Sequence, residues 1–164
     1  VGAAKTAGNY AASLYPTELV KKQGYDQIIW TDAKEHKYIE EAGSMNVMFL
    51  IGDTLITPQS SDTILAGITR RSVVDLVKSW GLKVEERQVS LEEVLAAIKN
   101  KTLKEAFGAG TAATISSIAV IAHDGIEYQL PKVADRKLEK RILNELDGIK
   151  RGTIQDTRDW IYKV

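Results

Sequence analysis

The sequence predicts an α/β domain in which a mixed sheet is flanked by helices. Apolar runs of strand length interleave along the chain with amphipathic runs of helix length, which is typical of a sheet covered by helices. Turn signals rich in glycine and aspartate join neighbouring strand segments, so some strand pairs are antiparallel and a purely parallel sheet is excluded. The length of 164 residues suits one domain with a sizeable core.

The first helix is expected at residues 9–23, with a kink or a restart at Pro16, because proline lacks the N–H group that a helix interior requires. Gly24 ends this helix. A short apolar strand follows at residues 26–31, and the polar residues 32–37 are expected to form a turn.

A buried strand is predicted at residues 45–51, because the apolar character persists there without strict alternation. Gly52-Asp53 is a hairpin signal that leads into a partner strand at residues 54–57. A helix at residues 69–80 carries apolar residues at i, i+4 and i+7, and Gly81 ends it.

The second half of the chain adds two helices and three strand segments. A strand at residues 82–89 precedes a helix that begins with a capping box of Ser90 and Glu93. Residues 112–122 and 126–130 are expected to form a hairpin. A last amphipathic helix is expected at residues 138–149, ended by Gly152.

The composition narrows the function classes. The 22 basic and 22 acidic residues cancel, which excludes a broad electrostatic grip on nucleic acid or anionic membrane. There is no cysteine, so disulfides, thiolate metal sites and a cysteine nucleophile are excluded. The longest apolar run is much shorter than the roughly 20 residues that span a bilayer. We therefore expect a soluble, globular domain. His36 and His123 lie in polar turns, are expected to be solvated, and predict no metal site.

Three segments carry residues suited to chemistry. Lys5 and Tyr10 place an amine and a phenol at an expected strand-to-helix junction, with small residues between them. Glu41 precedes the buried strand, although spacing alone favours an ordinary polar turn at residues 40–46. Glycine-bearing turns are expected at residues 64–69 and 107–112, and the first opens into a helix whose N–H groups suit a phosphate. Taken singly, each segment has an ordinary explanation: Lys5 as a surface lysine, residues 40–46 as a polar turn, and the glycines as residues that only allow the chain to turn.

Together and in this order, these segments resemble the C-terminal domain of the branched-chain amino-acid aminotransferases, which are pyridoxal-phosphate enzymes of fold type IV. The likeness covers essentially the whole chain. It is carried by residues 5–10, 38–46, 63–70, 80, 84–87, 107–112 and 152–164. Gly8-Asn9-Tyr10 after the lysine and Gly43-Ser44-Met45-Asn46 after the glutamate favour the branched-chain branch. The resemblance implies that the mixed sheet forms a partly closed barrel with flanking helices.

The resemblance also implies roles toward pyridoxal 5'-phosphate. Lys5 is the Schiff-base lysine, Tyr10 hydrogen-bonds the phenolic oxygen, and Glu41 faces the pyridine nitrogen. A carboxylate there keeps that nitrogen protonated, which makes the cofactor an electron sink. Lys5 then shuttles a proton, which requires that the site lower the pKa of its amine from about 10.4.

The remaining implied contacts concern the phosphate and the substrate. Backbone N–H groups of Gly67, Ile68 and Thr69 bind the phosphate, with help from Thr111. Thr111 and Ala112 meet the substrate carboxylate through their N–H groups. Ser44 stands where the family commonly has threonine and is also expected to contact the substrate.

The implied reaction is reversible amino-group transfer from leucine, isoleucine or valine to 2-oxoglutarate, in branched-chain amino-acid metabolism. The family adds an N-terminal small domain that supplies a phosphate-binding arginine and walls of the side-chain pocket. Residues 1–164 are expected to be the C-terminal domain alone, because the chain opens abruptly at Val1 with small residues. By itself it is expected to bind the cofactor weakly and to show little or no transamination. The family implies a homodimer or higher oligomer in the cytoplasm, or in the mitochondrial matrix of a eukaryote.

Two alternatives remain open. The chain could belong to another fold-type IV enzyme, a D-amino-acid aminotransferase or an aminodeoxychorismate lyase, because the residues that select the side chain lie mostly outside it. It could also be a non-catalytic domain of the same fold. Lys5, Tyr10 and Glu41 argue against that second alternative, because a scaffold does not need this set of polar residues.

Overall fold

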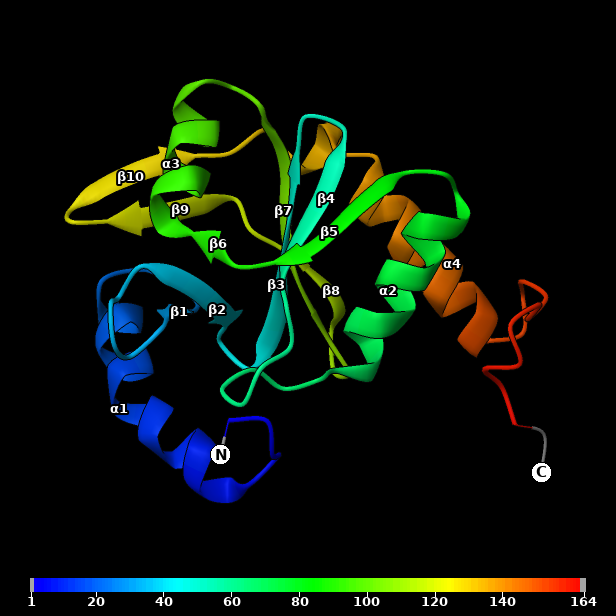
Figure 1. Cartoon of the computed structure of the whole chain (residues 1–164), viewed down its shortest axis with the longest axis horizontal. Coiled ribbons are helices and arrows are strands. Elements are labelled where there is room, and N and C mark those ends of the chain that lie inside the picture. Colours follow the sequence, from blue (N-terminus) through cyan, green and yellow to red (C-terminus); the bar gives the residue numbers. More distant parts are fainter. Residues whose placement is uncertain (1, 163–164) are drawn as a thin grey trace.

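Strand β3 (Met45–Ile51) lies at the centre of the fold in the computed structural model (Figure 1). One edge of β3 pairs antiparallel with β7 (Leu103–Gly110). The other edge pairs first with β2 (Tyr38–Ala42) and then with β4 (Thr54–Pro58). The structure describes residues 2–162. Outside them lie Val1, at the start of the expected domain, and Lys163 and Val164, in the segment 152–164 that carries part of the resemblance.

The other elements extend or cover this sheet. β1 (Ile29–Thr31) and β6 (Val89–Ser90) pair with β2, and β8 (Thr114–Ser117) pairs with β7. β5 (Lys83–Arg87) runs parallel to β4, whereas the other strand pairs of the described chain are antiparallel. The remaining elements are α1 (Ala7–Lys22), α2 (Ile68–Ser79), α3 (Leu91–Lys99), the hairpin β9 (Val120–His123) and β10 (Ile126–Gln129), the 3-10 turn η1 (Val133–Asp135), and α4 (Leu138–Lys150). The predicted α/β class with a mixed sheet is confirmed.

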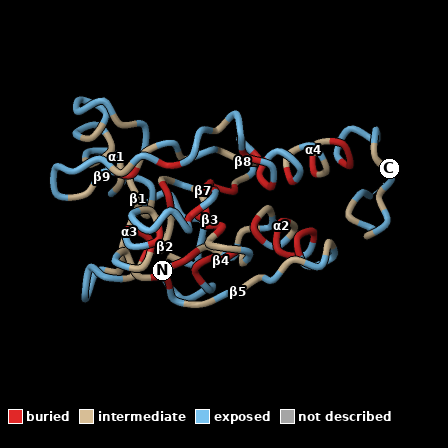
Figure 2. Tube along the Cα trace, turned by 90° about the horizontal axis from the view of Figure 1, so that it is seen from above, coloured by how far each residue is buried: buried red, intermediate tan, exposed pale blue. Residues whose placement is uncertain are grey.

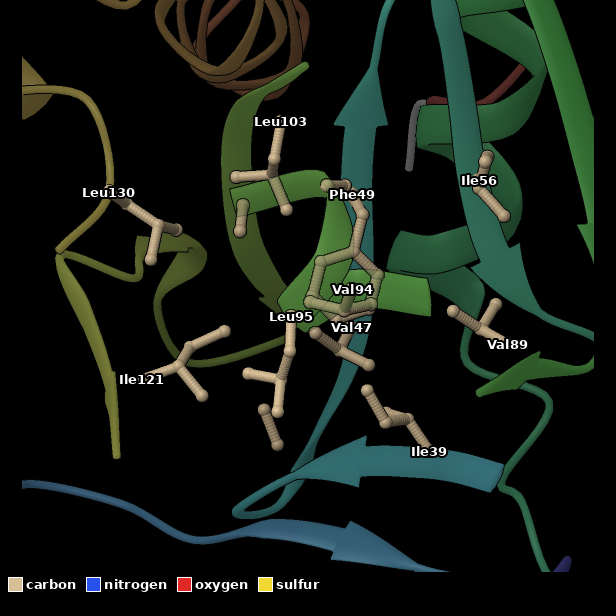
Figure 3. Close-up of a cluster of buried hydrophobic side chains, with 13 residues drawn as sticks. Ile39, Val47, Phe49, Ile56, Val89, Val94, Leu95, Leu103, Ile121 and Leu130 are labelled. Atoms are coloured by element: carbon tan, nitrogen blue, oxygen red, sulfur yellow. The ribbon is translucent and has the colours of Figure 1, made fainter. Parts of the chain in front are cut away.

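The two faces of β3 belong to two different cores. Val47 and Phe49 belong to a cluster that α3 and the β9–β10 hairpin cover, together with Val94 of α3 and Ile121 of β9 (Figure 3). Met48 and Leu50 point into the cluster formed with α2 and α4. Burial on both faces explains why the strand lacks an alternating pattern, and the prediction of a buried strand at residues 45–51 is confirmed.

The predicted helices are present, with one difference. α1 continues through Pro16 as one helix, so the expected restart there was wrong. No described residue of α1 is buried, and Figure 2 shows this helix as exposed and intermediate throughout. Gly24, Gly81 and Gly152 follow the ends of α1, α2 and α4 with φ of 91°, 78° and 72°, the left-handed conformation that favours glycine at this position.

The start of α3 keeps half of the predicted capping box. The Ser90 hydroxyl accepts a hydrogen bond from the Glu93 N–H at 3.0 Å. The Glu93 carboxylate does not reach back to Ser90 but pairs with the guanidinium of Arg87, with contacts of 2.5 and 2.9 Å. The single strand expected at residues 82–89 is divided into β5 and β6, with Gln88 between them.

Two strands were not predicted, and both correct the reading of candidate segments. Residues 40–42 lie in β2 rather than in a polar turn, because β2 and β3 form a tight hairpin that turns at Gly43, where φ is 59°. Residues 107–110 lie in β7, so the expected turn at residues 107–112 begins only after Gly110. A Cβ at Gly108 or Gly110 would lie 2.9 Å from the Met45 side chain, which is why glycine stands there.

Two further boundaries differ. Residues 112–122 form β8 and β9 with a break between them, so the expected hairpin is limited to β9 and β10. Residues 2–6 form a turn before α1, not the end of a strand. None of the helices within residues 2–162 has the length and apolar character needed to cross a membrane.

Candidate functional site

Glu41 is a half-buried carboxylate on β2. Its Oε1 accepts hydrogen bonds from the Leu65 N–H at 3.2 Å and from the Asn46 side-chain amide at 3.3 Å. Burial raises the pKa of the Glu41 carboxyl, the Leu65 N–H opposes that rise, and neighbouring Glu40 adds to it. Both donors bind Oε1, which leaves Oε2 as the oxygen available to a ligand. A cationic group placed there would relieve the cost of burying this carboxylate.

Asn46 joins Glu41 to the loop formed by residues 59–67, called here the 59–67 loop. Its side chain is nearly fully buried, and Nδ2 also donates to the Leu65 carbonyl at 2.9 Å. The same carbonyl accepts the N–H of Gly67 at 2.8 Å. Glu41, Asn46, Leu65 and Gly67 therefore form one continuous set of hydrogen bonds.

Gly67 is the residue that precedes the first turn of α2. Its backbone is extended, and among the described residues no side chain caps this end of the helix. The first N–H groups of a helix have no partner inside it, so Ile68 and Thr69 present free donors at the positive end of the helix dipole. No acidic residue lies in this first turn. The arrangement suits an anionic group such as a phosphate.

Lys5 lies in a turn that packs on the same loop, Tyr10 lies on α1, and neither side chain bonds Glu41 within the described residues. Lys5 is exposed in the turn before α1, and Tyr10 is 36% exposed on α1. Ala3 donates its N–H to the Asp62 carbonyl at 3.0 Å, so the Lys5 turn packs on the 59–67 loop, as Figure 1 shows near the N-terminus. Within residues 2–162 no hydrogen bond or ion pair joins the side chains of Lys5 or Tyr10 to Glu41.

The 59–67 loop is thus the meeting point of the Lys5 turn and β2. Beyond its contact with Ala3, it binds both neighbouring carboxylates of β2: Thr63 donates its hydroxyl to Glu40 at 2.6 Å, and Leu65 donates its N–H to Glu41. Residues distant in the sequence are brought to one end of the sheet by these contacts.

Ser44, Thr111 and Ala112 lie in two exposed turns at this same end. Ser44 is in the β2–β3 hairpin turn, and the other two follow β7. β3 runs antiparallel to β7 with Asn46 opposite Ala109, so the start of β3 and the end of β7 are adjacent. The two turns therefore flank the Asn46 side of the site.

Two surface hollows lie away from this end of the sheet. One lies beside η1 and the first turns of α4, and contains Arg136, Lys140 and Arg141. The other lies along α3 and contains His36 and His123. In the part of the chain that the structure describes, no three potential ligands gather around a metal site, and both histidines remain at the surface as expected.

Asn46 and Leu65 were missed as site residues by the sequence reasoning. One signal was available for Asn46, because it is the one amide in the apolar run of residues 45–51 and such a group is buried only with partners. Leu65 acts through its backbone, and its side-chain type gives no signal.

Comparison with known proteins shows which family the sequence of this chain matches. Residues 2–121 match the family described as amino-transferase class IV. The chain is 41% identical over 163 residues to branched-chain-amino-acid aminotransferase 2 of Bacillus subtilis, covering 99% of this chain and 45% of that protein. The chain therefore spans about half the length of the curated relatives it matches.

Solved structures agree with the sequence comparison. The branched-chain amino acid aminotransferase of Escherichia coli superposes with a TM-score of 0.78 at 29% identity, over 99% of this chain and 51% of that chain. The branched-chain amino acid aminotransferase of Thermobaculum terrenum in its PLP-form superposes with a TM-score of 0.70 at 30% identity, over 88% of this chain and 45% of that chain.

Proposed function

The chain belongs to the amino-transferase class IV family, and from this premise we propose that it is the cofactor-binding part of a pyridoxal-phosphate-dependent branched-chain aminotransferase. The whole protein transfers amino groups between leucine, isoleucine or valine and 2-oxoglutarate. The observation that carries the proposal is the linked set of Glu41, Asn46 and Gly67, which sets a carboxylate beside an uncapped helix N-terminus. The likeness to the Bacillus subtilis enzyme supports the choice of substrate class.

The residues present fit pyridoxal 5'-phosphate. When bound, this group supplies an electron sink for the bonds at the substrate Cα. Glu41 holds a proton on the pyridine nitrogen, and the half-buried position of its carboxyl favours such a cationic neighbour. The N–H groups of Ile68 and Thr69 receive the phosphate at the start of α2, assisted by Thr111. The Gly67 N–H, which was expected to join them, instead donates to the Leu65 carbonyl, so Gly67 contributes the close approach of its backbone.

Lys5 and Tyr10 lie in the turn before α1 and on α1. With the cofactor present, Lys5 would hold it covalently and move a proton at the substrate Cα, and Tyr10 would donate to the phenolic oxygen. The packing of the Lys5 turn on the 59–67 loop supports this assignment, because the loop also holds Glu41. The substrate carboxylate is received by the N–H groups of Thr111 and Ala112, with Ser44 beside them.

The proposal extends to the rest of the protein. An N-terminal small domain of the same protein completes the site with further phosphate and pocket contacts, and the coverage of about half of each relative supports this. In the assembled protein the sheet described here forms part of a partly closed barrel. The protein works in the cytoplasm, or in the mitochondrial matrix of a eukaryote, as a homodimer or higher oligomer.

Lysine substitution tests the cofactor role. Added to the intact protein, pyridoxal phosphate should produce the visible absorption band of a lysine-bound cofactor, and Lys5→Ala should abolish it. Lys21→Ala, an exposed lysine on α1, is the matched control and should leave the band unchanged. A band that persists in Lys5→Ala would remove Lys5 from its role.

Substrate assays test the reaction. L-leucine with 2-oxoglutarate should be turned over by the intact protein, whereas D-alanine should not; the reverse preference would favour a D-amino-acid aminotransferase. No turnover and no cofactor binding would favour a non-catalytic domain. The 164-residue chain assayed alone should bind the cofactor weakly and show little transamination. Ordinary turnover by this chain would overturn the proposed need for a second domain.

A further inference from the structure

We propose that Asn46 is a positioning residue, which fixes Glu41 relative to the turn at Gly67 and so sets the separation between the carboxylate and the phosphate-binding N–H groups. The proposal rests on the proposed function and adds to it a residue that touches neither substrate nor cofactor.

The direction of the Asn46 amide is fixed by its partners. Nδ2 lies 3.3 Å from Glu41 Oε1 and 2.9 Å from the Leu65 carbonyl oxygen. An ionised carboxylate and a carbonyl both accept hydrogen bonds and cannot donate them, so the NH2 end must face both. One amide nitrogen thus uses its two hydrogens to hold two separate elements, β2 and the 59–67 loop.

Leu65 closes this arrangement into a ring. Its N–H donates to the same Oε1 of Glu41 that Asn46 binds, while its carbonyl accepts Asn46. The carbonyl also accepts the Gly67 N–H at 2.8 Å. A shift of the Asn46 amide therefore moves both the Glu41 carboxylate and Gly67, the residue that precedes the first turn of α2.

The other end of the amide packs directly on Gly67. A Cβ built on Gly67 would lie 2.2 Å from Asn46 Oδ1, so the amide occupies the space where any other residue would carry its side chain. Asn46 is itself held firmly, since its backbone lies in β3 between Glu41 on one edge and Ala109 on the other. It is 5% exposed, which leaves the side chain little freedom.

These contacts matter because the ring nitrogen and the phosphate of a pyridoxal phosphate belong to one small molecule and are joined through a short ester arm, so the distance between them varies only over a limited range. Glu41 and the N–H groups at the start of α2 have to suit that range at the same time. A misplacement of about 1 Å in a site can cost on the order of 100-fold in rate. Holding both groups from one buried amide on a central strand meets this requirement.

The first test measures the pKa of the Glu41 carboxyl in the cofactor-free intact protein by carbon NMR titration. Asn46→Ala should raise this pKa further, because the charged carboxylate loses a donor and gains none. Thr57→Val is the matched control: Thr57 is fully buried in the neighbouring strand and donates to the Val47 carbonyl at 2.8 Å, away from Glu41. It removes one buried hydrogen bond and should leave the Glu41 pKa where it is. An unchanged Glu41 pKa in Asn46→Ala would overturn the proposal.

The second test measures the dissociation constant of pyridoxal phosphate. Asn46→Asp keeps the shape of the side chain but turns the donor toward Glu41 into an acceptor, so it separates the loss of the donor from the loss of side-chain volume in Asn46→Ala. Affinity should fall about 10- to 100-fold, the range expected when a charge-assisted hydrogen bond is lost. Thr57→Val should change it less than about 3-fold. Equal affinity in wild type and Asn46→Asp would also overturn the proposal.

The two tests separate this proposal from the proposed function. The pKa measurement requires no cofactor, so it stands even if the intact protein binds no pyridoxal phosphate. Conversely, a protein that binds the cofactor equally well with and without the Asn46 donor keeps its proposed function and loses only this positioning residue.

Discussion

Glu105 on β7 accepts a hydrogen bond from the backbone N–H of Leu138 at 2.9 Å, at the start of α4. Its carboxylate also accepts the N–H groups of Lys137 at 2.7 Å and Glu139 at 2.8 Å. The residue before α4 supplies no cap of its own, because Lys137 has helical φ and ψ and no capping side chain. A carboxylate 32 to 34 residues earlier in the chain therefore caps this helix.

Removal of this distant cap should destabilise the chain strongly. Glu105 is 5% exposed, so Glu105→Ala leaves three N–H groups without a partner in a site that water reaches poorly. The free energy of unfolding should fall by about 2–4 kcal/mol, as measured by urea denaturation. Glu92→Ala, on an exposed carboxylate in the first turn of α3, is the control and should change stability by less than about 0.5 kcal/mol. Equal effects of the two substitutions would contradict the capping role.

Two glycine-to-alanine substitutions should have opposite signs. At Gly67 the new Cβ would lie 2.2 Å from Asn46 Oδ1, so Gly67→Ala must displace a buried amide and should cost about 1–3 kcal/mol. At Gly8, inside α1, nothing lies within 4 Å of the new Cβ. Gly8→Ala should therefore stabilise by about 0.5–1 kcal/mol, because alanine loses less backbone entropy in a helix.

The double mutant provides the check on this reason. Combined with Asn46→Ala, the Gly67→Ala substitution should cost much less than alone, because the obstructing amide is gone. Strictly additive effects in denaturation experiments would place the cost of Gly67→Ala elsewhere.

Local patterns were sufficient for most of the fold. The signals for α2, α3 and α4 are local: an amphipathic period in all three, and a glycine after the end of α2 and of α4. The bounds of these helices were therefore predicted within one or two residues. β2 and β7 were missed because their stability comes from pairing with β3 on either side. Glu41 and Gly108 are unremarkable in their own segments, and only the strand opposite makes them extended.

The candidate site was predictable as a set of residue types rather than as a geometry. The resemblance named Glu41, Gly67 and Thr69, and the structure brings their segments to one end of the sheet. The connections between them run through the Leu65 backbone and a buried amide. Backbone hydrogen bonds depend on the course of the 59–67 loop, which no local pattern in those residues specifies.

Asp32 should contribute a pH dependence at the acid end. Its carboxylate accepts the N–H groups of Tyr38, Glu35 and Lys37, which hold its pKa at about 2 instead of 3.8. A carboxyl with a lowered pKa stabilises the fold at pH values above its ordinary pKa, and this stabilisation is lost as the pH falls through the lowered pKa. Asp32→Asn should therefore destabilise the chain at pH 7, and its deficit should shrink between about pH 4 and pH 2 in urea denaturation. A deficit that is constant over this range would contradict the prediction.

Glu41 should show the opposite dependence. Its pKa is raised by burial above the ordinary 4.5, so folding favours the protonated carboxyl. A raised pKa contributes stability that is fully present below the ordinary value and is lost as the pH rises through the raised one. Glutamine is neutral at all pH values and matches the protonated form in shape. The free energy of unfolding of Glu41→Gln, relative to that of wild type, should therefore be higher at pH 7 than at pH 4. Urea denaturation of the cofactor-free chain at both values measures this difference. If the stability of Glu41→Gln relative to wild type were instead lower at pH 7 than at pH 4, the two donors would stabilise the ionised carboxylate more than its half-buried position implies. A cationic ligand would then not be needed to balance its charge.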